Sequence, residues 1–254
     1  MKIGVITGAS SGMGKEFVKI IMQDKTKGMD EIWVIARRRE RLEMWPKLYR
    51  KQKFRIFPLD LSQKKDLEFL KKTVEEEKPQ VELLIHCAGF GIMGKIDELS
   101  MEEQEEMVDV NCRSVTEVTS IFLPYMEEGG RMIYMASAAA FLPQPGFAVY
   151  AAGKAFVLSY VRALRAENRH RNLKITAVCP GAVKTEFFNR ALEKRHLPAY
   201  KKLVMADPKR VVKKAWKDNL KNKELSVYGK AIQLTRLAAK ILPHSVFLQF
   251  MGRK

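Results

Sequence analysis

The chain has 254 residues, of which 46% are hydrophobic and 30% are charged, and its formal net charge is +17. This size and apolar content allow one full-sized core, whereas charged residues or prolines interrupt every apolar run before it reaches the ~18 residues of a membrane span. The basic residues are interleaved with glutamates, without a contiguous basic stretch, an aromatic stacking platform or a zinc-ligand motif. We therefore expect no nucleic acid partner and no bound metal.

Cysteine usage and the start of the chain indicate the compartment. Cys87, Cys112 and Cys179 are far apart and form no CxxC pair, as is typical of buried free thiols in a reducing environment. An apolar strand pattern begins at Lys2, which leaves no room for a secretory leader. We therefore expect a cytoplasmic protein.

Seven short apolar runs alternate with helix-length amphipathic segments along the chain. The runs are Lys2–Ile6, Glu31–Ala36, Lys53–Pro58, Val81–His86, Gly130–Ala136, Leu173–Val178 and Leu225–Val227. Strands separated by helices cannot pair as hairpins, so right-handed crossovers should build a parallel sheet with helices on both faces. We predict one α/β domain over residues 1–254, with a doubly wound (Rossmann) sheet of seven parallel strands. Ligands of such sheets bind beyond the carboxyl ends of the strands.

The segment after the first predicted strand has the features of a phosphate-binding turn. It reads Thr7-Gly8-Ala9-Ser10-Ser11-Gly12-Met13-Gly14, and a helical pattern follows from Lys15 to about Asp24. Glycine permits positive φ and a close approach of the backbone to a pyrophosphate, and the free amides of a helix start attract the anion. Ser10 and Ser11 can add hydroxyl donors. An ordinary tight turn is the alternative, but the place between the first strand and the first helix favours a dinucleotide site.

Three arginines follow the second predicted strand, where NAD-selective folds place an acid on the ribose 2′-hydroxyl. Here Ala36 takes the place of the acid and Arg37 follows it, with Arg38 as a second candidate. A guanidinium fork suits a 2′-phosphate, so the sequence predicts NADP(H) rather than NAD(H). The arginines could instead form a solvated helix start, although cations there oppose the helix dipole.

Tyr150 and Lys154 stand four residues apart at the predicted start of a helix, so both side chains share one face and can meet one ligand. Chance also produces this pattern, because Tyr49 and Lys53 have the same spacing across the end of the second predicted helix. Ser137 distinguishes the first pair, since it directly follows the fifth predicted strand, at the carboxyl edge of the sheet.

These groups suit hydride transfer between nicotinamide and a carbonyl or secondary alcohol. A phenol has a pKa near ~10 and acts as a base at neutral pH only beside positive charge, here Lys154 and oxidised nicotinamide. Tyr150 would exchange a proton with the substrate oxygen while Ser137 orients that oxygen. Asn111 lies in a helix predicted over Met101–Tyr125, where it is either an anchor for a proton-relay water or an ordinary polar residue.

Together these motifs resemble the short-chain dehydrogenase/reductase family in its single-domain form, from Lys2 to about Val227. The resemblance implies that the glycine turn binds the cofactor, that Arg37 selects NADP, and that Asp60 and Leu61 contact the adenine. It further implies a catalytic tetrad of Asn111, Ser137, Tyr150 and Lys154, in which Lys154 also holds the nicotinamide ribose. A homodimer or homotetramer built on the helices that carry Asn111 and Tyr150 is implied as well.

Two more segments are compared with the family. Pro180-Gly181-Ala182-Val183-Lys184-Thr185 is similar to its segment after the sixth strand, in which the Val183 backbone and Thr185 would meet the nicotinamide carboxamide. His86-Cys87-Ala88-Gly89 departs from the usual Asn-Asn-Ala-Gly, a segment that stabilises the central strand and flanks the adenine ribose. The departure puts local hydrogen bonding in question, not catalysis, and Ala88 and Gly89 are still expected at the cofactor.

The irregular stretch at about 182–206 is interpreted as a substrate lid. Its apolar side chains, with those of the loop before Tyr150, predict an apolar pocket for a bulky hydrophobic substrate such as a hydroxysteroid, a bile acid or a lipid-like ketone. Core packing or a dimer contact is the alternative. The residues are Phe187, Phe188, Leu192, Leu197, Leu203 and Met205 in the lid, and Phe141, Leu142, Pro143, Pro145 and Phe147 in the loop.

Residues 228–254 form a basic amphipathic extension. From Lys230 to Leu242, the side chains of Leu234, Leu237, Ala238 and Ile241 fall on one stripe, with basic residues elsewhere. We expect this stripe to pack against the sheet or over the substrate mouth, in preference to peripheral contact with an anionic membrane.

Two other functions are compatible with parts of the pattern. A catalytically idle module that senses NADPH or acts as a scaffold fits the fold alone, but the complete tetrad argues against it. A sugar-nucleotide epimerase or dehydratase shares the Tyr-x-x-x-Lys pair but resembles a longer chain. The sequence therefore favours an NADP(H)-dependent oxidoreductase.

Overall fold

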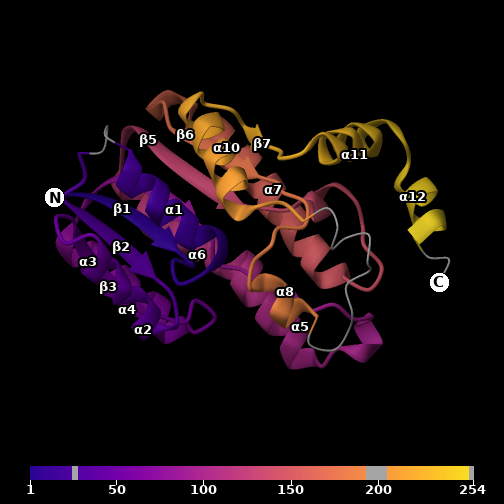
Figure 1. The fold of residues 1–254 in the computed structure, drawn as a ribbon, viewed down its shortest axis with the longest axis horizontal. Coiled ribbons are helices and arrows are strands. Elements are labelled where there is room, and N and C mark those ends of the chain that lie inside the picture. Colours follow the sequence, from indigo (N-terminus) through magenta and orange to yellow (C-terminus); the bar gives the residue numbers. More distant parts are fainter. Residues whose placement is uncertain (25–27, 193–204, 252–254) are drawn as a thin grey trace.

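The computed structural model describes residues 1–24, 28–192 and 205–251 and contains one seven-stranded parallel sheet (Figure 1). The strand order is β3-β2-β1-β4-β5-β6-β7, so β1 lies between β2 and β4 and the winding direction reverses there. The doubly wound fold is confirmed. The strands are β1 (Lys2–Thr7), β2 (Glu31–Ile35), β3 (Lys53–Phe57), β4 (Gln80–His86), β5 (Met126–Met135), β6 (Lys174–Val178) and β7 (Leu225–Ser226).

Helices connect consecutive strands. The α-helices are α1 (Gly12–Gln23), α2 (Arg39–Leu42), α3 (Met44–Leu48), α4 (Lys64–Glu77), α5 (Met101–Val108), α6 (Ser114–Phe122), α7 (Ala148–Glu167), α8 (Phe187–Ala191), α10 (Pro208–Leu220), α11 (Lys230–Ile241) and α12 (His244–Met251). A π-turn, η2 (Asp109–Arg113), joins α5 to α6. Short 3₁₀ turns are η1 (Ile96–Glu98), η3 (Leu123–Tyr125), η4 (Ala138–Phe141) and η5 (Arg169–Arg171).

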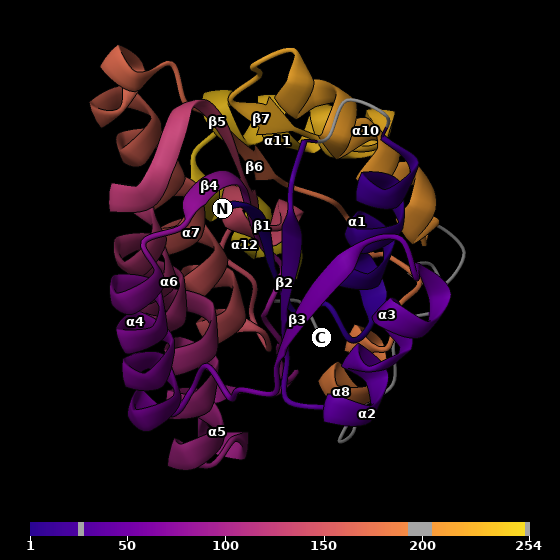
Figure 2. The ribbon, with the colours of Figure 1, turned by 90° about the vertical axis from the view of Figure 1, so that its left-hand side faces the viewer.

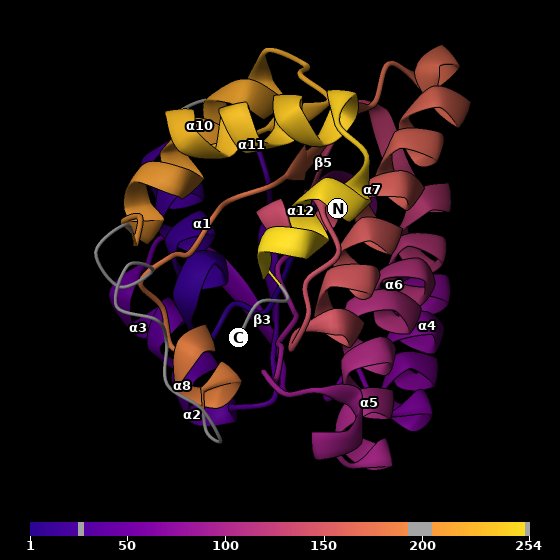
Figure 3. The same ribbon diagram turned by 90° about the vertical axis from the view of Figure 1, so that its right-hand side faces the viewer.

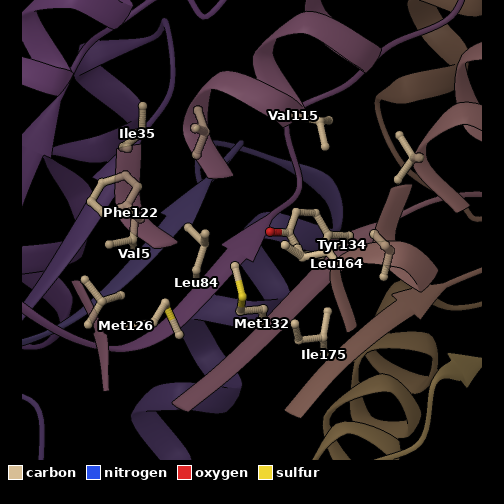
Figure 4. Packing of buried hydrophobic residues seen from close by; sticks show 14 of the residues in the cluster. Val5, Ile35, Leu84, Val115, Phe122, Met126, Met132, Tyr134, Leu164 and Ile175 are labelled. Atoms are coloured by element: carbon tan, nitrogen blue, oxygen red, sulfur yellow. The ribbon is translucent and has the colours of Figure 1, made fainter. Parts of the chain in front are cut away.

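The two faces of the sheet bury separate apolar clusters, as the side-chain alternation of strands requires. On β2, Trp33 and Ile35 belong to one cluster and Ile32 and Val34 to the other. The helices α4, α6 and α7 cover the first face, and α1, α3 and α10 cover the second (Figure 2). Figure 4 shows the first cluster, in which residues such as Leu84, Phe122, Met132 and Ile175 converge. Both faces are therefore buried, and ligands can reach the sheet only at its edges.

Two predicted segments differ in detail from the structure. The fifth strand begins at Met126 rather than Gly130, because Met126 pairs with Val81 before a shift in register. Tyr49 follows α3 as its cap, and Lys53 begins β3, so this second Tyr-x-x-x-Lys pair does not share a helix face. Its interpretation as a chance pattern is consistent with that placement.

The C-terminal helices α11 and α12 extend beyond the last strand at one end of the molecule (Figures 1 and 3). One side of α11 faces the body, where Ile232 lies near Gly181 and Gln233 Nε2 donates to the Val227 carbonyl at 3.3 Å. The side chains of Leu234, Leu237 and Ile241 are exposed. The expectation that this stripe packs against the sheet is therefore wrong, because the opposite side of the helix makes that contact. No helix within the described residues is long and apolar enough to span a membrane.

Candidate active site

A cleft of about 430 Å³ opens where the strand order reverses, beyond the carboxyl ends of β1, β2 and β4. Its volume lies within the range of roughly 300–1,000 Å³ that is usual for ligand pockets. The predicted cofactor residues that line it are Gly8, Ser10, Ser11, Gly12, Met13, Gly14, Arg37, Arg38, Asp60, Leu61, Ala88, Gly89 and Thr185. The sequence motifs from five separate segments are thus brought to one place.

The glycine turn of the cleft has a backbone that only glycine accommodates. Gly8 and Gly12 have φ of 67° and 51°, and a Cβ on Gly14 would lie 2.2 Å from the Gly8 carbonyl oxygen. The first helical bond of α1 joins Lys15 N to Ser11 O at 3.1 Å, so the earlier amides precede the hydrogen-bonded ladder. No acidic residue stands in this first turn of α1. The turn therefore fits a dinucleotide pyrophosphate in both shape and charge.

The arginines after β2 lie at the other end of the cleft and are paired with carboxylates. Arg37 Nη1 is 3.5 Å from Glu106 Oε1 and 3.9 Å from Asp60 Oδ2. Arg38 Nη1 contacts Glu186 Oε2 at 3.1 Å, and Arg38 Nη2 donates to Ser10 Oγ at 3.4 Å. Both guanidinium groups are about half exposed, at 56% and 40%. They can therefore turn toward an anion in the cleft.

The segment after β3, which is expected to contact the adenine, forms part of the lining of the cleft. The Asp60 amide donates to Asp66 Oδ2 at 2.7 Å, and Asp60 Oδ1 accepts from the Ser62 hydroxyl at 2.8 Å. Leu61 is buried beside it. These bonds fix the segment, so its position is set before any ligand binds.

The departure at His86-Cys87 is compensated from β1. Thr7 Oγ1 accepts from the amides of Cys87 and Ala88, each at 3.1 Å, and so ties β1 to the loop after β4. His86 is buried and stacks on Tyr134 with ring centroids 6.3 Å apart. Burial lowers the pKa of His86 to about 3, so its ring is neutral at physiological pH. A threonine hydroxyl thus binds two backbone amides of this segment, whereas the buried His86 Nε2 has no hydrogen-bond partner among the described residues.

Ser137, Tyr150 and Lys154 meet beside the cleft, at a place that we call its inner end. None of the three is among the residues that line the cleft, but Lys154 Nζ would lie 3.1 Å from a Cβ on Gly89, which does line it. Ser137 follows β5, and its hydroxyl forms a hydrogen bond with Tyr150 as well as accepting from the Ala139 amide at 3.1 Å. Lys154 Nζ donates to the Met135 carbonyl at 3.0 Å and lies 5.6 Å from the centroid of the Tyr150 ring. One turn of α7 and the end of β5 therefore hold all three groups together.

Burial dominates the protonation of this pair. It raises the pKa of Tyr150 to about 12, against the opposing hydrogen bond from Ser137, and it lowers the pKa of Lys154 to about 8. The expected lowering of the Tyr150 pKa by Lys154 is therefore not seen in the protein alone. A phenol that keeps its proton is suited to donate it to a developing alkoxide.

Asn111 lies in the π-turn η2 rather than in a regular helical turn. It is fully buried, its Nδ2 donates to the Phe90 carbonyl at 2.7 Å, and its Oδ1 has no hydrogen-bond partner among the described residues. A Cβ on Gly89 would lie 2.8 Å from Asn111 Oδ1 and 3.1 Å from Lys154 Nζ. The free acceptor is thus held close to the lysine. π-turns are frequent at functional sites.

The two ends of the segment that follows β6 are joined by backbone hydrogen bonds. Ala206 N donates to Ala182 O at 2.9 Å, and Lys184 N donates to Ala206 O at 3.0 Å, in a bridge of Val183 with Ala206. Thr185 lies against Gly12, across the mouth of the cleft. Val183 is buried in the core, and Pro180 and Gly181 are not among the residues that line the cleft. Thr185 is therefore the member of this motif that the structure brings to the cofactor turn.

An apolar cluster surrounds Tyr150 outside the two faces of the sheet. The ring of Phe147 stacks on that of Tyr150 with centroids 4.3 Å apart, and Phe187 lies at 5.4 Å. Phe141 instead packs on the core, and Pro143 and Pro145 are exposed. Phe188, Leu192, Met205 and Leu142 are half-buried, whereas Leu197 and Leu203 lie outside the described residues. Only some of the predicted apolar residues therefore flank Tyr150.

One contact at the cleft was missed from the sequence. Glu186, next to Thr185, accepts from Arg41 Nη1 at 2.7 and 2.8 Å in addition to its contact with Arg38. The bond from Arg41 lowers the pKa of Glu186, so the carboxylate is charged at neutral pH. Its separation of 145 residues from Arg41 gives no local signal, although an acid in a loop opposite an arginine cluster is a pattern that could be sought.

No group of three or more His, Cys, Asp or Glu side chains is arranged to hold a metal ion in the part of the chain that the structure describes.

Comparisons with known proteins identify the family of the chain. The family model for short chain dehydrogenases matches residues 2–196. An uncharacterized oxidoreductase of Staphylococcus saprophyticus is 31% identical over 197 residues, which are 76% of this chain and 78% of that protein. Among solved structures, an alcohol dehydrogenase from the archaeon Thermococcus sibiricus, complexed with 5-hydroxy-NADP, superposes with a TM-score of 0.75 and 27% identity, covering 89% of this chain and 95% of the other.

A second structural neighbour bears on cofactor choice. A short chain dehydrogenase/reductase from Burkholderia phymatum in complex with NAD has a TM-score of 0.80 and 22% identity, covering 98% of this chain and 95% of the other. Proteins of this fold thus occur with either dinucleotide, and the fold does not decide between them. The match over residues 2–196 and the 31% identical relative establish that the chain belongs to the short-chain dehydrogenase/reductase family of oxidoreductases.

Proposed function

We propose that the protein is an NADP(H)-dependent oxidoreductase that interconverts a carbonyl and a secondary alcohol. The observation that carries the proposal is the meeting of Ser137, Tyr150 and Lys154 at the inner end of the cleft that the glycine turn opens. A catalytically idle nucleotide sensor has no need of a buried phenol and a buried lysine, whose desolvation is costly.

The side chains act on the substrate oxygen. NADP(H), when bound, supplies or accepts the hydride. In the reduction, Ser137 donates a hydrogen bond to the carbonyl oxygen, and Tyr150 transfers its phenolic proton to the same oxygen as negative charge develops there. Lys154 stabilises the resulting phenolate, and its Nζ would hold the nicotinamide ribose. Oxidation of the alcohol uses the same groups in reverse.

Asn111 would anchor a water that relays a proton from solvent to Tyr150 through Lys154. Its buried Oδ1 is an acceptor beside Lys154 Nζ, both packed around Gly89. A buried carbonyl of this kind is usually satisfied by an ordered water, which would connect the lysine to solvent. The π-helical turn supports this role, because such turns are frequent at functional sites.

The preference for NADP(H) rests on the residues after β2. Ala36 lines the cleft where an acid would repel a phosphate, and Arg37 and Arg38 line it with exposed guanidinium groups. A planar fork can bind a 2′-phosphate through two hydrogen bonds. We therefore expect NADPH to bind at least tenfold more tightly than NADH.

The substrate class is proposed from the aromatic rings around Tyr150. Phe147 and Phe187 contact its ring, and apolar residues such as Phe90, Ile92 and Leu99 complete the cluster. A bulky hydrophobic ketone or alcohol, such as a hydroxysteroid, a bile acid or a lipid-like ketone, suits such a wall. The segment 182–206, closed at its base by the bridge to Ala206, would act as the lid.

Two further expectations are kept as proposals. A homodimer or homotetramer through the helices of Asn111 and Tyr150 is supported by the exposed rings and side chains on them, Phe156 on α7 and Val108 on α5. A cytoplasmic, reducing location is supported by the three free thiols.

The test combines nucleotide binding with turnover. NADPH and NADH are titrated into the wild type and Arg37→Ala, and NADPH oxidation is then followed with steroid, bile-acid, aliphatic and sugar carbonyls. We expect tighter NADPH binding that Arg37→Ala reduces, and turnover of a hydrophobic carbonyl that Tyr150→Phe abolishes. Binding of NADPH without turnover of any carbonyl would support the sensor instead, a preference for sugars would refute the substrate class, and a failure to bind either nucleotide would refute the whole proposal.

A further inference from the structure

The C-terminal helix α11 exposes an apolar stripe. Leu234, Leu237 and Ile241 are 67%, 56% and 72% exposed, and their spacing places them on one side of the helix. Leu242 and Val246 follow as exposed apolar residues before and within α12. Other large exposed apolar side chains among the described residues are fewer on any one helix: Met101 and Val108 lie on α5, Phe69 on α4 and Phe156 on α7. A contiguous stripe of this kind marks a contact surface.

A basic groove on α10 adjoins this region. Arg210, Lys213, Lys214, Lys217 and Lys221 line it along one side of the helix. Its single acid, Asp218, is buried and already pairs with Lys214 and Lys223. The groove therefore carries a net positive charge.

The groove and the helix that carries the stripe follow one another along the chain. Tyr228, which lies two residues before α11, also lines the groove. The ribbons of α10 and α11 run along the same upper edge of the molecule in three views related by rotation about the vertical axis (Figures 1, 2 and 3). Lys230 and Lys240 add exposed positive charge on α11 itself. We name the exposed residues of α10 and α11 at this edge the basic-apolar edge; they are Arg210, Lys213, Lys217, Lys221, Lys230, Leu234, Leu237, Lys240 and Ile241.

We propose that the basic-apolar edge docks on the surface of an anionic lipid bilayer. Burial of leucine and isoleucine side chains at the boundary between headgroups and acyl chains lowers the free energy through the hydrophobic effect. Lysines near the surface lower it further by attraction to the lipid phosphates. The stripe and the exposed Lys230 and Lys240 share α11, and the basic groove lies on the preceding helix, as peripheral binding to an anionic surface requires. Docking would be peripheral and reversible.

Other partners match the edge less well. A nucleic acid would pair with the lysines but would leave the leucine stripe in water, because no exposed aromatic side chain of the edge is placed for base stacking. A second copy of the chain would bring a strongly positive edge close to another, which costs free energy. An anionic bilayer satisfies both the charge and the apolar stripe.

The experiment measures vesicle binding by the full-length protein. The wild type is sedimented with vesicles of phosphatidylcholine alone and with vesicles containing one third phosphatidylglycerol. We expect at least tenfold stronger binding to the anionic vesicles, with a decrease at high salt because the charge contribution is screened.

Two variants separate the contributions of the edge. Leu234→Ser/Leu237→Ser/Ile241→Ser removes the stripe, and Lys213→Glu/Lys217→Glu reverses the charge of the groove. Each should reduce binding to anionic vesicles at least tenfold. Phe69→Ser and Lys65→Glu on α4 are matched controls, an exposed apolar and an exposed basic residue outside the edge, and they should bind as the wild type does. Circular dichroism melting checks that every variant is folded.

Four results would overturn the proposal. One is wild-type protein that stays in the supernatant with both kinds of vesicle. Another is binding that the controls on α4 lower as much as the edge variants do. The third is a concentration-dependent dimer in sedimentation velocity that the stripe variant abolishes, without vesicle binding by the wild type, which would assign the stripe to a second copy. The fourth is wild-type protein that binds random duplex DNA but not vesicles, with DNA binding lost in Lys213→Glu/Lys217→Glu. This result would assign the groove to nucleic acid.

Discussion

The two ends of the cofactor cleft differ in how far their ionisable side chains are exposed to water. At the inner end, Tyr150 and Lys154 are only 8% and 4% exposed, and burial shifts the pKa of both. At the outer end, the side chains of Arg37 and Arg38 are about half exposed, and each forms an ion pair with a partly exposed glutamate. Water screens the outer charges but not the inner ones.

This difference predicts where substitutions act strongly. Groups at the inner end interact in a low dielectric, so each should contribute orders of magnitude to the rate. Contacts at the outer end exchange with water, so each should contribute a small factor to cofactor affinity. The substitutions below test the comparison from the largest expected effect to the smallest.

Lys154→Met should produce the largest loss. Methionine keeps much of the buried volume but cannot stabilise the Tyr150 phenolate, so we expect turnover to fall by about 10²–10⁴-fold. Steady-state NADPH oxidation with the best carbonyl of the panel measures it. Lys53→Met, at the lysine of the second Tyr-x-x-x-Lys pair, is the matched control and should turn over as the wild type does. Equal losses in the two variants would show that the spacing around Tyr150 has no catalytic meaning.

Gly14→Ala should damage binding of both dinucleotides. The new Cβ would lie 2.2 Å from the Gly8 carbonyl oxygen, so the glycine turn must open. Overpacking of this kind costs about 1–3 kcal/mol, and we expect the affinity for NADPH and for NADH to fall together by roughly tenfold or more. Isothermal titration measures both. Gly28→Ala, where no atom lies within 4 Å of the added Cβ, is the control. A loss confined to NADPH would contradict a role of the turn at the pyrophosphate.

The buried lysine should also be visible in the pH dependence of stability. Because the folded pKa of Lys154 is about 8, below its unfolded value of 10.5, the unfolded state holds more protons between these pH values. The free energy of unfolding should therefore rise with pH in this window, by about 2 kcal/mol between about pH 7.5 and pH 9.5 from this group. Urea unfolding of the wild type minus that of Lys154→Met isolates the contribution, since the thiols and the other lysines cancel. A difference that is flat with pH would mean that the lysine is solvated.

The sequence predicts the inner end better than the outer one. The strands, the glycine turn, Ser137, Tyr150 and Lys154 are local patterns whose positions follow from parallel winding, and each lies where that winding requires. The π-turn at Asn111 depends on packing against Gly89 and Lys154, so the sequence indicates only that an asparagine within a helix is unusual there. Phe141 is predicted to line the pocket, but it packs on the core. The sequence of a loop has no regular period from which the direction of a side chain can be predicted.

The outer end depends on a contact between distant segments. Glu186 reaches Arg41 and Arg38 from the far side of the cleft, over 145 and 148 residues. No periodicity or spacing links these positions, and only the fold brings them together. The orientation of α11 likewise depends on the fold. The sequence predicts its apolar stripe, but the prediction that the stripe packs inward is wrong, because these side chains are exposed.

Glu186→Gln should have the smallest effect and the opposite sign. In the protein alone the Glu186 carboxylate contacts Arg38 Nη1 at 3.1 Å, so a 2′-phosphate that uses Arg38 must compete with it. Exposed ion pairs contribute about 0.2–1 kcal/mol, and removing this one should tighten NADPH binding by roughly threefold while NADH binding stays unchanged. Glu43→Gln, at the i,i+4 partner of Arg39, removes a comparable exposed carboxylate outside the cleft and should change neither affinity. Weaker binding of both dinucleotides in Glu186→Gln would instead make the glutamate a clamp that holds Thr185 over the glycine turn, and the outer end would then be preorganised as the inner end is.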